Sequence, residues 1–213
     1  LIYNNKAINR YKKDNFGISK DKSKSLNLLK RSIIDLENCD LKKYAKNIVF
    51  SDGNPNSKIM LIGEAPGANE DQEGLPFVGR AGQLLDKMLS SIDLDRKKVY
   101  ISNIVNYRPP ENRKPTEKEV ERYLPYLKKH IEIVKPKIIL LLGSTAMNAI
   151  LGKTDVISKT RGKWHEFEIN KLKIYSLVSF HPAYLLRQPD QKKYSWHDLK
   201  EIRKKIDELN INI

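Results

Sequence analysis

Apolar residues are distributed along this chain in two ways, as short continuous runs and as stretches with helical spacing. Continuous runs lie at residues 58–63, 99–105, 137–143 and 173–180. Strands that are covered on both faces have such continuous runs, whereas strands with one exposed face alternate between apolar and polar residues. The runs therefore predict a central four-stranded, mainly parallel sheet.

Between these runs, apolar residues recur at steps of three and four, as in amphipathic helices. Thr116 and Glu119 have the spacing of a capping box, and Gly152 is a helix stop signal. Strands that alternate with helices predict an α/β chain with three layers, α/β/α. The predicted helices span residues 25–36, 80–92, 116–134, 144–152 and 195–209.

Two regions differ in character along the chain. Residues 1–24 are rich in Lys and Arg and show no sustained period, which predicts a basic, flexible arm. Residues 25–213 have the length and pattern of a single domain.

The charge balance favours an anionic partner. Forty Lys and Arg face 26 Asp and Glu, a formal net charge of +14. Nucleic acid or an anionic membrane face suits this charge; the alternative is a Lys-rich composition that only favours solubility. No apolar run approaches the roughly 20 residues of a membrane span. The one cysteine, Cys39, excludes an internal disulfide and predicts a reducing, cytoplasmic setting.

Chemistry-bearing residues follow the predicted strands. In parallel α/β sheets, ligands bind at the carboxyl ends of the strands, where these residues fall. The loops at 63–78 and 180–194 are long for connections of this kind, which marks them as candidate functional loops.

The first of these loops combines bare backbone with acidic groups. Gly63 lets the main chain approach a ligand closely, and Glu64 and Glu70 follow it, with Phe77 as an apolar plate. The loop lacks the ending of a phosphate-binding loop. The alternative is a tight strand-to-helix turn with solvated acids.

Two further strand ends carry candidate binding groups. Asn103 has an amide that can donate and accept hydrogen bonds, as reading a nucleobase edge requires; the alternative is a turn former. Arg108, Arg113 and Lys114 on the same connection could track a nucleic-acid backbone, although a solvated loop would look similar. His181 directly follows an apolar run, so we expect its imidazole at the sheet edge.

An adjacent leucine pair follows His181. Leu185 and Leu186 stand beside Arg187, and an exposed apolar wedge ringed by cations is how proteins separate base steps. The alternative is a helix that packs both leucines on the core.

The motifs "GEAPG", "PFVGRAGQLLD", "YISNIVNYRPPENRKP", "RGKW" and "HPAYLLR" together resemble the uracil-DNA glycosylase superfamily, closest to its iron–sulfur type, family four. The similarity runs from about Cys39 to the C-terminus. It implies hydrolysis of the N-glycosidic bond of uracil in DNA, giving free uracil and an abasic site. We expect a monomer with uracil-containing DNA as its partner.

The resemblance also implies roles for single residues. Glu64 and the neighbouring backbone would line the uracil pocket, Phe77 would stack on the base, and Asn103 would bond the uracil edge. His181 would face uracil O2, where negative charge develops. The loop with Tyr184 would enter the duplex.

The group that orients the attacking water stays open. Ala65, in the backbone lining the pocket, stands where the best-known uracil glycosylases have a water-activating Asp. Glu64, Glu70 and Asn112 are candidates, and so is unaided capture of water by the sugar cation. Glu70 would alternatively exclude the methyl group of thymine.

The iron–sulfur relatives hold a cluster through four cysteines, which match Leu36, Cys39, Tyr107 and Tyr123 here. A single thiolate cannot hold a four-iron cluster, so we predict no cofactor. The two tyrosines are expected to fill the vacated volume with their hydroxyls directed outward. The alternative places Tyr123 on an ordinary helix surface.

Two other functions stay open on the sequence. One is a catalytically weak or inactive DNA-binding accessory protein of the same fold. The other is a glycosylase for another deaminated base.

Overall fold

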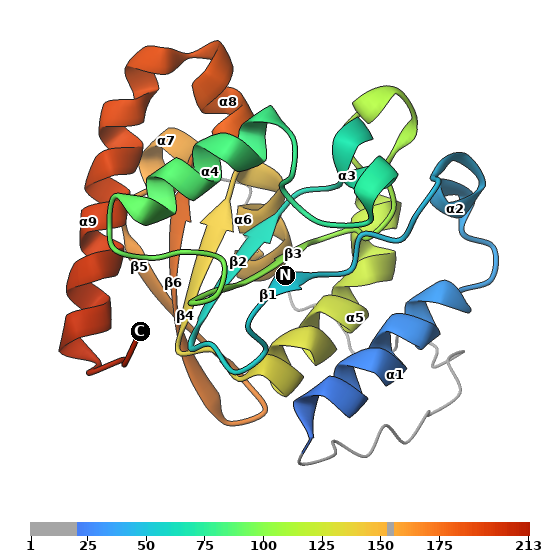
Figure 1. Cartoon of the computed structure of the whole chain (residues 1–213), viewed down its shortest axis with the longest axis horizontal. Coiled ribbons are helices and arrows are strands. Elements are labelled where there is room, and N and C mark those ends of the chain that lie inside the picture. Colours follow the sequence, from blue (N-terminus) through green and yellow to red (C-terminus); the bar gives the residue numbers. More distant parts are fainter. Residues whose placement is uncertain (1–20, 153–155) are drawn as a thin grey trace, which may run out of the picture.

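The computed structural model describes residues 21–152 and 156–213, and the described strands form one six-stranded sheet (Figure 1). The strand order is β1-β3-β2-β4-β6-β5. The four inner strands pair in parallel, and an antiparallel strand lies at each edge. The strands are β1 (Asp52–Gly53), β2 (Ile59–Gly63), β3 (Tyr100–Asn103), β4 (Ile138–Leu142), β5 (Trp164–Ile169) and β6 (Leu172–Ser179).

The parallel core confirms the four predicted strands, but the prediction of a four-stranded sheet was incomplete. The continuous apolar runs became β2, β3, β4 and β6, and residues of β2, β3 and β4 are buried throughout. The missed strand β5 alternates between half-buried and exposed residues, because an edge strand has one solvated face. The missed strand β1 is only two residues long.

Helices cover both faces of the sheet, which confirms the three-layer arrangement. Helices α1, α5 and α6 contribute to the apolar cluster on one face, and α4 and α9 to the cluster on the other. The α-helices are α1 (Lys22–Ile34), α2 (Asp40–Tyr44), α3 (Ala68–Glu73), α4 (Arg80–Ser90), α5 (Glu117–Val134), α6 (Ser144–Leu151), α7 (Ile157–Thr160), α8 (Pro182–Arg187) and α9 (Lys192–Glu208). Two 3₁₀ turns are η1 (Pro110–Asn112) and η2 (Pro189–Gln191).

Local signals set several helix ends as expected. Thr116 Oγ1 accepts from the Glu119 amide at 3.3 Å, and Glu119 accepts from the Thr116 amide at 2.7 Å, so the predicted capping box forms. Gly152 ends α6 with a positive φ of 61°. Helices α1 and α9 each begin three residues earlier than predicted. Residues 1–20 of the predicted arm lie outside the described residues.

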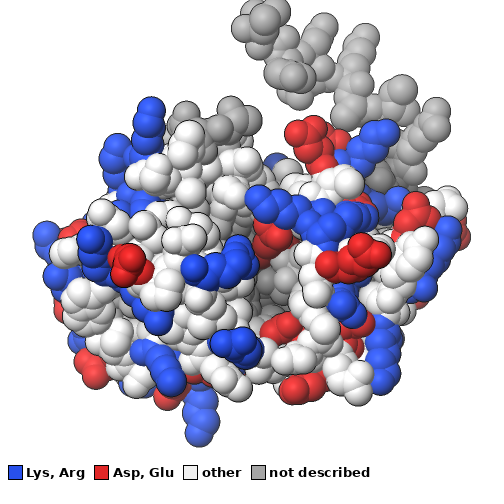
Figure 2. Space-filling view, turned by 90° about the horizontal axis from the view of Figure 1, so that it is seen from above, with Lys and Arg blue, Asp and Glu red and all other residues white. Residues whose placement is uncertain are grey.

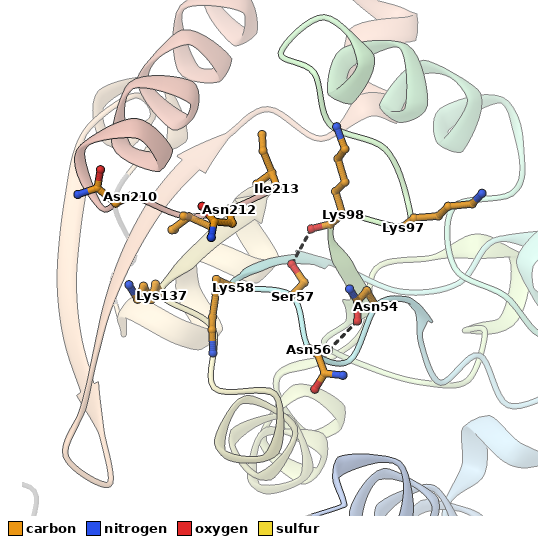
Figure 3. Close-up of a pocket in the computed structure, with 11 residues that line it drawn as sticks. Asn54, Asn56, Ser57, Lys58, Lys97, Lys98, Lys137, Asn210, Asn212 and Ile213 are labelled. Carbon is orange, nitrogen blue, oxygen red and sulfur yellow. Dashed lines mark hydrogen bonds between the residues drawn. The ribbon is translucent and has the colours of Figure 1, made fainter.

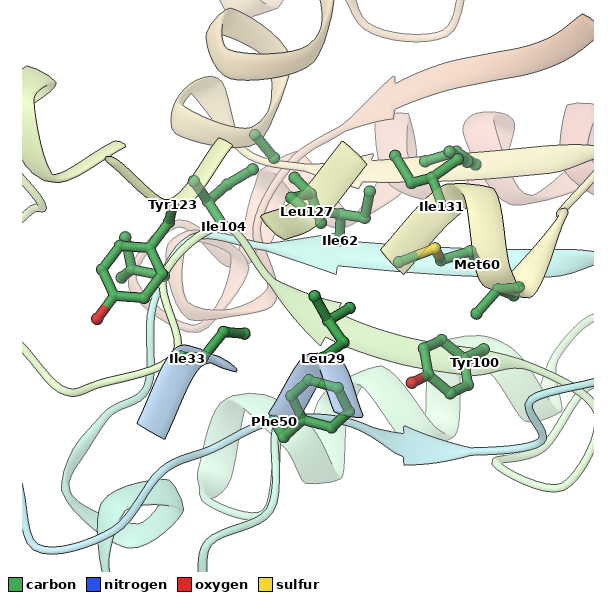
Figure 4. Close-up of a cluster of buried hydrophobic side chains, with 14 of the residues drawn as sticks. Leu29, Ile33, Phe50, Met60, Ile62, Tyr100, Ile104, Tyr123, Leu127 and Ile131 are labelled. Carbon is green, nitrogen blue, oxygen red and sulfur yellow. The ribbon is translucent and has the colours of Figure 1, made fainter. Parts of the chain in front are cut away.

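The larger core cluster joins α1 and α5 to the sheet. Figure 4 shows Leu29 and Ile33 of α1 beside the sheet residues, with Leu127 and Ile131 of α5 on the same cluster. All four side chains are at most 3% exposed. Burial of such side chains contributes roughly 1.5–3 kcal/mol each, which fixes the N-terminal helix to the domain.

The sheet reverses its winding direction between β2 and β4. Helix α4, which follows β2, packs on one face, and α6, which follows β4, packs on the other. In open α/β sheets, the crevice at such a switch point binds the ligand. The loops after β2 and β4 are therefore the first place to look for a site. No described helix has both the length and the apolar character needed to cross a membrane.

Candidate active site

Three predicted residues converge around Gly63 at the end of β2. A methyl group added at Gly63 would come within 2.5 Å of Phe77 Cζ and would overlap Asn103 Oδ1. The rings of Phe77 and His181 stack with centroids 5.5 Å apart and an interplanar angle of 29°. Phe77, Asn103 and His181 therefore border one region rather than three, and we call it the Gly63 pocket.

Phe77 is held in an unusual backbone conformation. Its φ is 55°, in the left-handed region that non-glycine residues seldom occupy. Glu70 lies on the amide side and accepts hydrogen bonds from the backbone of Gly67, Val78 and Gly79, at 3.1, 2.9 and 2.8 Å. Both oxygens of Glu70 are thus used to shape the loop around Phe77.

Arg96 holds the same loop on its carbonyl side. Its guanidinium donates to the carbonyl oxygen of Pro76 at 3.1 Å and to that of Phe77. The same group forms ion pairs with Asp52 at 2.7 Å and Asp86 at 2.8 Å. Arg96 therefore ties the Phe77 backbone to both β1 and α4.

His181 is presented as a neutral hydrogen-bond donor. Its Nδ1 accepts from the Ala183 amide at 3.1 Å, as the N-cap of α8. With Nδ1 used as an acceptor, the proton of the neutral imidazole resides on Nε2. Burial is the main cause that lowers the pKa of His181 to about 4. The positive charge of Arg187 also lowers this pKa, and its effect is larger than the opposite effect of the negative charge of Glu70.

Asn103 carries an unsatisfied acceptor. Its side chain is 3% exposed, and the buried Oδ1 has no hydrogen-bond partner among the described residues. Leaving a buried acceptor unpaired costs about 1–3 kcal/mol, so such atoms call for an explanation. Its place against Gly63 makes it available to a donor in the Gly63 pocket.

Glu64 lies at the switch point between β2 and β4. Thr145, in the first turn of α6, donates its hydroxyl hydrogen bond to Glu64 Oε2. This bond joins the loop after β2 to the helix after β4. One carboxylate oxygen is thereby fixed, and the bond sets where the carboxylate lies.

The face at the carboxyl ends of the strands is hollowed and bordered by positive charge. Figure 2 shows it from above, with Lys and Arg side chains on both sides of a hollow in which acidic side chains also appear. Such an arrangement suits an anionic polymer with a less charged group inserted at the centre.

The sequence itself decides the family. Residues 50–202 match the model of the uracil DNA glycosylase superfamily. The chain belongs to the uracil-DNA glycosylase superfamily. It is 41% identical to the type-4 uracil-DNA glycosylase of Sulfurisphaera tokodaii over 184 residues, 84% of each chain. It is also 41% identical to that of Archaeoglobus fulgidus, covering 84% of this chain and 92% of the relative. A DNA polymerase of Bacillus phage SP01 is 31% identical over 75% of this chain, but over only 17% of the phage protein.

In this member of the uracil-DNA glycosylase superfamily, only one leucine of the predicted wedge is exposed. Leu185 is 1% exposed and belongs to the core cluster under α4 and α9, whereas Leu186 is 37% exposed. Adjacent residues of a helix point 100° apart, so α8 buries one leucine and exposes the other. The prediction of a two-leucine wedge is wrong for Leu185. Tyr184 is half-buried against Phe180, and Arg187 is exposed.

The predicted basic ridge is exposed at Arg113 and half-buried at Arg108, and both residues already have partners. Arg108 donates to Asn112 Oδ1 at 2.8 Å, and Arg113 makes a bidentate contact with Glu119 at 2.7 and 2.8 Å. Lys114 is exposed. Asn112 lies in the exposed turn η1, and its described side-chain contact is with Arg108, outside the Gly63 pocket.

The four positions that correspond to cluster ligands gather in one place. Leu36, Cys39, Tyr107 and Tyr123 are all buried in the α1–α5 core, and Cys39 Sγ lies 3.2 Å from the Tyr123 hydroxyl. Burial raises the pKa of both tyrosines, and Cys39 adds to the rise. The alternative of a surface Tyr123 is wrong, and its hydroxyl points to the thiol rather than outward.

These residues do not fit a four-iron cluster. One thiol is available where about four are needed, and the remaining side chains are two tyrosines and a leucine. Among the described residues, no group of three or more His, Cys, Asp or Glu could hold a metal ion.

A second concavity lies at the opposite edge of the sheet. Figure 3 shows this pocket of about 380 Å³, lined by loops that precede β2, β3 and β4 and by the end of the chain. Lys58, Lys97, Lys98 and Lys137 border it, and their ammonium groups point apart in Figure 3. No predicted site residue lines it, so it is separate from the Gly63 pocket.

Two residues that shape the site, Thr145 and Arg96, were not predicted from the sequence. Thr145 follows the apolar run that forms β4, but a Thr in the first turn of a helix does not by itself indicate a functional residue. Arg96 precedes β3 at the opposite edge of the sheet, and only its folded contacts show that it reaches Phe77.

Proposed function

We propose that this protein is a uracil-DNA glycosylase that hydrolyses the N-glycosidic bond of uracil in DNA. The observation that carries the proposal is the convergence of Phe77, Asn103 and His181 around Gly63. The similarity to type-4 uracil-DNA glycosylases supports it. We further propose that residues 25–213 act as one domain and that the protein is a cytoplasmic monomer.

Base recognition is assigned to Asn103 and Phe77. Uracil has an N3–H donor, and the unpaired Oδ1 of Asn103 is the complementary acceptor in a buried setting. Phe77 offers a ring face on which a pyrimidine can stack. Gly63 and Ala65 supply backbone that a base can approach closely.

Bond cleavage is assigned to His181. As the C1′–N1 bond breaks, its electron pair moves onto uracil, and negative charge develops at O2. A neutral imidazole with its proton on Nε2 can donate a hydrogen bond to that oxygen without first losing a proton. Preorganised donors of this kind stabilise the charge that develops in the transition state.

Water activation is assigned to Glu64. The deoxyribose cation at C1′ is captured by the oxygen of a water molecule, which transfers a proton to the Glu64 carboxylate. Both oxygens of Glu70 accept backbone hydrogen bonds, and Asn112 contacts Arg108 in an exposed turn. Glu64 is the remaining candidate side chain, the alternative being unaided capture of water by the sugar cation, and Thr145 fixes the position of its carboxylate.

DNA contacts are assigned to the exposed residues around the pocket. Leu186 is the exposed apolar side chain that can enter the duplex, beside Tyr184 and Arg187. Removing a base from the stack costs a few kcal/mol, which contacts with the wedge and the phosphates offset. The ridge residues Arg108, Arg113 and Lys114 are proposed to contact phosphates.

We also propose that the protein works without an iron–sulfur cluster. The contact between Cys39 and Tyr123 occupies the position of the cluster, and the four side chains fill the volume around it. The proposed mechanism uses no metal or nucleotide cofactor.

The test is incubation with an oligonucleotide that contains one uracil, followed by alkali to cleave abasic sites. We expect strand breaks at uracil and none in the matched oligonucleotide with thymine. Oligonucleotides with hypoxanthine or xanthine test the other deaminated bases. Binding to DNA without breaks at any of these bases would instead support an accessory protein, a role suggested by the similarity to the phage DNA polymerase.

A further inference from the structure

Helices α8 and α9 expose apolar and aromatic side chains. Leu186 is 37% exposed, Tyr194 39% and Trp196 43%. These are three of the few large apolar side chains that the described surface exposes, and they lie within eleven residues of one another. We call this surface the α8–α9 corner. His181 is the N-cap residue of α8, so the proposed catalytic residue directly precedes the helix that carries Leu186.

The α8–α9 corner also carries positive charge. Between residues 182 and 197 the chain has three cations, Arg187, Lys192 and Lys193, and one acid, Asp190. All three cations are exposed. A surface with this charge and no compensating carboxylate cluster favours an anionic partner.

A lysine ammonium group lies over each of the two aromatic rings, and the Arg161 guanidinium also lies over the Tyr194 ring, 5.3 Å from its centroid. Lys193 Nζ is 5.2 Å from the ring centroid of Tyr194, and Lys200 Nζ is 5.8 Å from that of Trp196. A nucleotide carries a flat base and a phosphate a short distance apart. Trp196 is 43% exposed and has one ammonium group over its ring, so it offers a ring for a base and a nearby cation for a phosphate.

The start of α9 is held firmly in place. Arg161 donates to the Tyr194 carbonyl at 2.6 Å and forms a buried ion pair with Asp198. Asp198 also accepts from Ser179, two residues before His181, at 2.7 Å. The contacts of Arg161 and Asp198 thus connect the start of α9, which carries the aromatic rings, to Ser179 at the end of β6.

We propose that the α8–α9 corner binds a strand of the substrate DNA beside the flipped nucleotide, with a base stacked on Trp196 and phosphates at Lys193 and Lys200. The inference rests on the proposed function only in that DNA is the ligand. It adds a base-stacking contact outside the uracil pocket and predicts tighter binding where neighbouring bases are unpaired.

Trp196 provides a direct readout, because the chain has only two tryptophans. In a Trp164→Phe variant of the full chain, Trp196 is the sole tryptophan. We expect its fluorescence to be quenched on titration with a single-stranded oligonucleotide that contains no uracil, and its exposure to acrylamide to fall. The matched Trp196→Phe variant reports Trp164, whose fluorescence should stay unchanged.

Binding measurements complete the test. Trp196→Ala should weaken single-strand binding by roughly tenfold, as expected for loss of one base–aromatic stack. Lys193→Gln should lower the slope of log affinity against log salt by about 0.7, as expected for one phosphate contact. Circular dichroism checks that both variants remain folded.

Two outcomes would overturn the proposal. In one, a labelled oligonucleotide binds by anisotropy while Trp196 fluorescence and acrylamide exposure do not change. In the other, no single-stranded oligonucleotide binds at all, which would leave the corner to a different partner such as an acidic protein. Quenching of Trp196 without uracil excision would instead support the corner and contradict the proposed function.

Discussion

The packing of the candidate site requires that residue 63 has no side chain. The Phe77 ring and the Asn103 amide both lie where a Cβ would stand. Gly143 has a related role, because a Cβ there would lie 3.2 Å from His181 Cβ. Glycines at two strand ends therefore let three functional side chains approach one another.

Gly63→Ala should abolish most of the uracil release. The added methyl group must displace Asn103 or Phe77, and overpacking of this kind costs about 1–3 kcal/mol of stability. A misplaced binding group should lower the single-turnover rate by about a hundredfold. The measurement is single-turnover excision together with urea unfolding.

Gly152→Ala is the matched control for that substitution. Gly152 has a positive φ of 61° and open space around it, so an added methyl group strains only the local backbone. We expect a stability loss of about 1 kcal/mol and unchanged excision. Equal activity of the Gly63 variant and this control would remove Gly63 from the site.

Single residues differ in how far the sequence predicts them. Asn103 and His181 follow buried strands, and the carboxyl ends of parallel strands meet at one edge, so their convergence could be predicted. Leu185 could not be placed, because a leucine pair on a short helix fits both a wedge and a core contact. Packing under α4 decides that it is core.

The loop that carries Phe77 is an element held from both sides. Glu70 accepts from the amides that follow Phe77, and Arg96 donates to the carbonyls of Pro76 and Phe77. Gly82 of α4 lets the Phe77 carbonyl lie against the helix. Arg96 is thus a positioning residue, since it touches the Phe77 backbone rather than the pocket itself.

Arg96→Gln should release this loop and impair base stacking. We expect the single-turnover rate to fall by about tenfold to a hundredfold, as is typical when a group shifts by about 1 Å. The loss should be smaller for Arg96→Lys, which keeps the charge. Weaker quenching of a fluorescent base analogue at the uracil position would separate loss of stacking from loss of stability.

The surface residue Arg203 provides a control for Arg96. It pairs with Asp207 at 3.1 Å on α9 and has no proposed role in catalysis. Arg203→Gln should leave excision unchanged. If Arg96→Gln also leaves the rate and the stacking signal unchanged, the positioning role is contradicted.

The junction between α2 and α5 is packed by the four side chains at the positions that correspond to cluster ligands. Cys39 caps the start of α2, and its thiol meets the Tyr123 hydroxyl of α5 inside the core. The sequence shows that three of the four cysteines are absent, and from it we could predict that the two tyrosines fill the space. The direction of the Tyr123 hydroxyl could not, because it depends on the position of Cys39 across the helices.

Tyr123→Phe should lower the free energy of unfolding by about 1 kcal/mol, the typical value of one buried hydrogen bond. The exposed Tyr44 gives the matched control, and Tyr44→Phe should change stability by less than about 0.5 kcal/mol. Urea unfolding measures both. Stoichiometric iron and sulfide in the purified protein would contradict the whole interpretation of this junction.

At the scale of the molecule, hydrophobic pattern predicted the inner sheet and missed its edges. Continuous runs identify strands that are buried on both faces, and β5 and β1 do not meet that condition. The winding direction follows from the spatial order of the strands in the sheet, and this order cannot be read from a single sequence. That order creates the switch point where Glu64 meets Thr145.

The whole protein should lose stability in mild acid. Burial lowers the pKa of His130 to about 3 and that of His181 to about 4, whereas an unfolded histidine titrates near 6.5. Between pH 6.5 and pH 4 the unfolded chain binds more protons at both positions. The free energy of unfolding should therefore fall by about 1.4 kcal/mol per pH unit for each histidine as pH decreases.

Urea unfolding at several pH values measures this slope. The contribution of both histidines should be constant above pH 6.5, and only His130 should contribute below pH 4. His130→Gln should reduce the slope, and a substitution at the exposed His197 should leave it unchanged. An equal slope in all three proteins would contradict the lowered pKa of His130.

The role of His181 in uracil release is tested by the single-turnover rate of His181→Ala, compared with that of the unsubstituted protein. If the buried neutral imidazole stabilises the departing uracil anion, the rate should fall by roughly two orders of magnitude or more while DNA binding persists. An unchanged rate in a folded, DNA-binding variant would contradict the account.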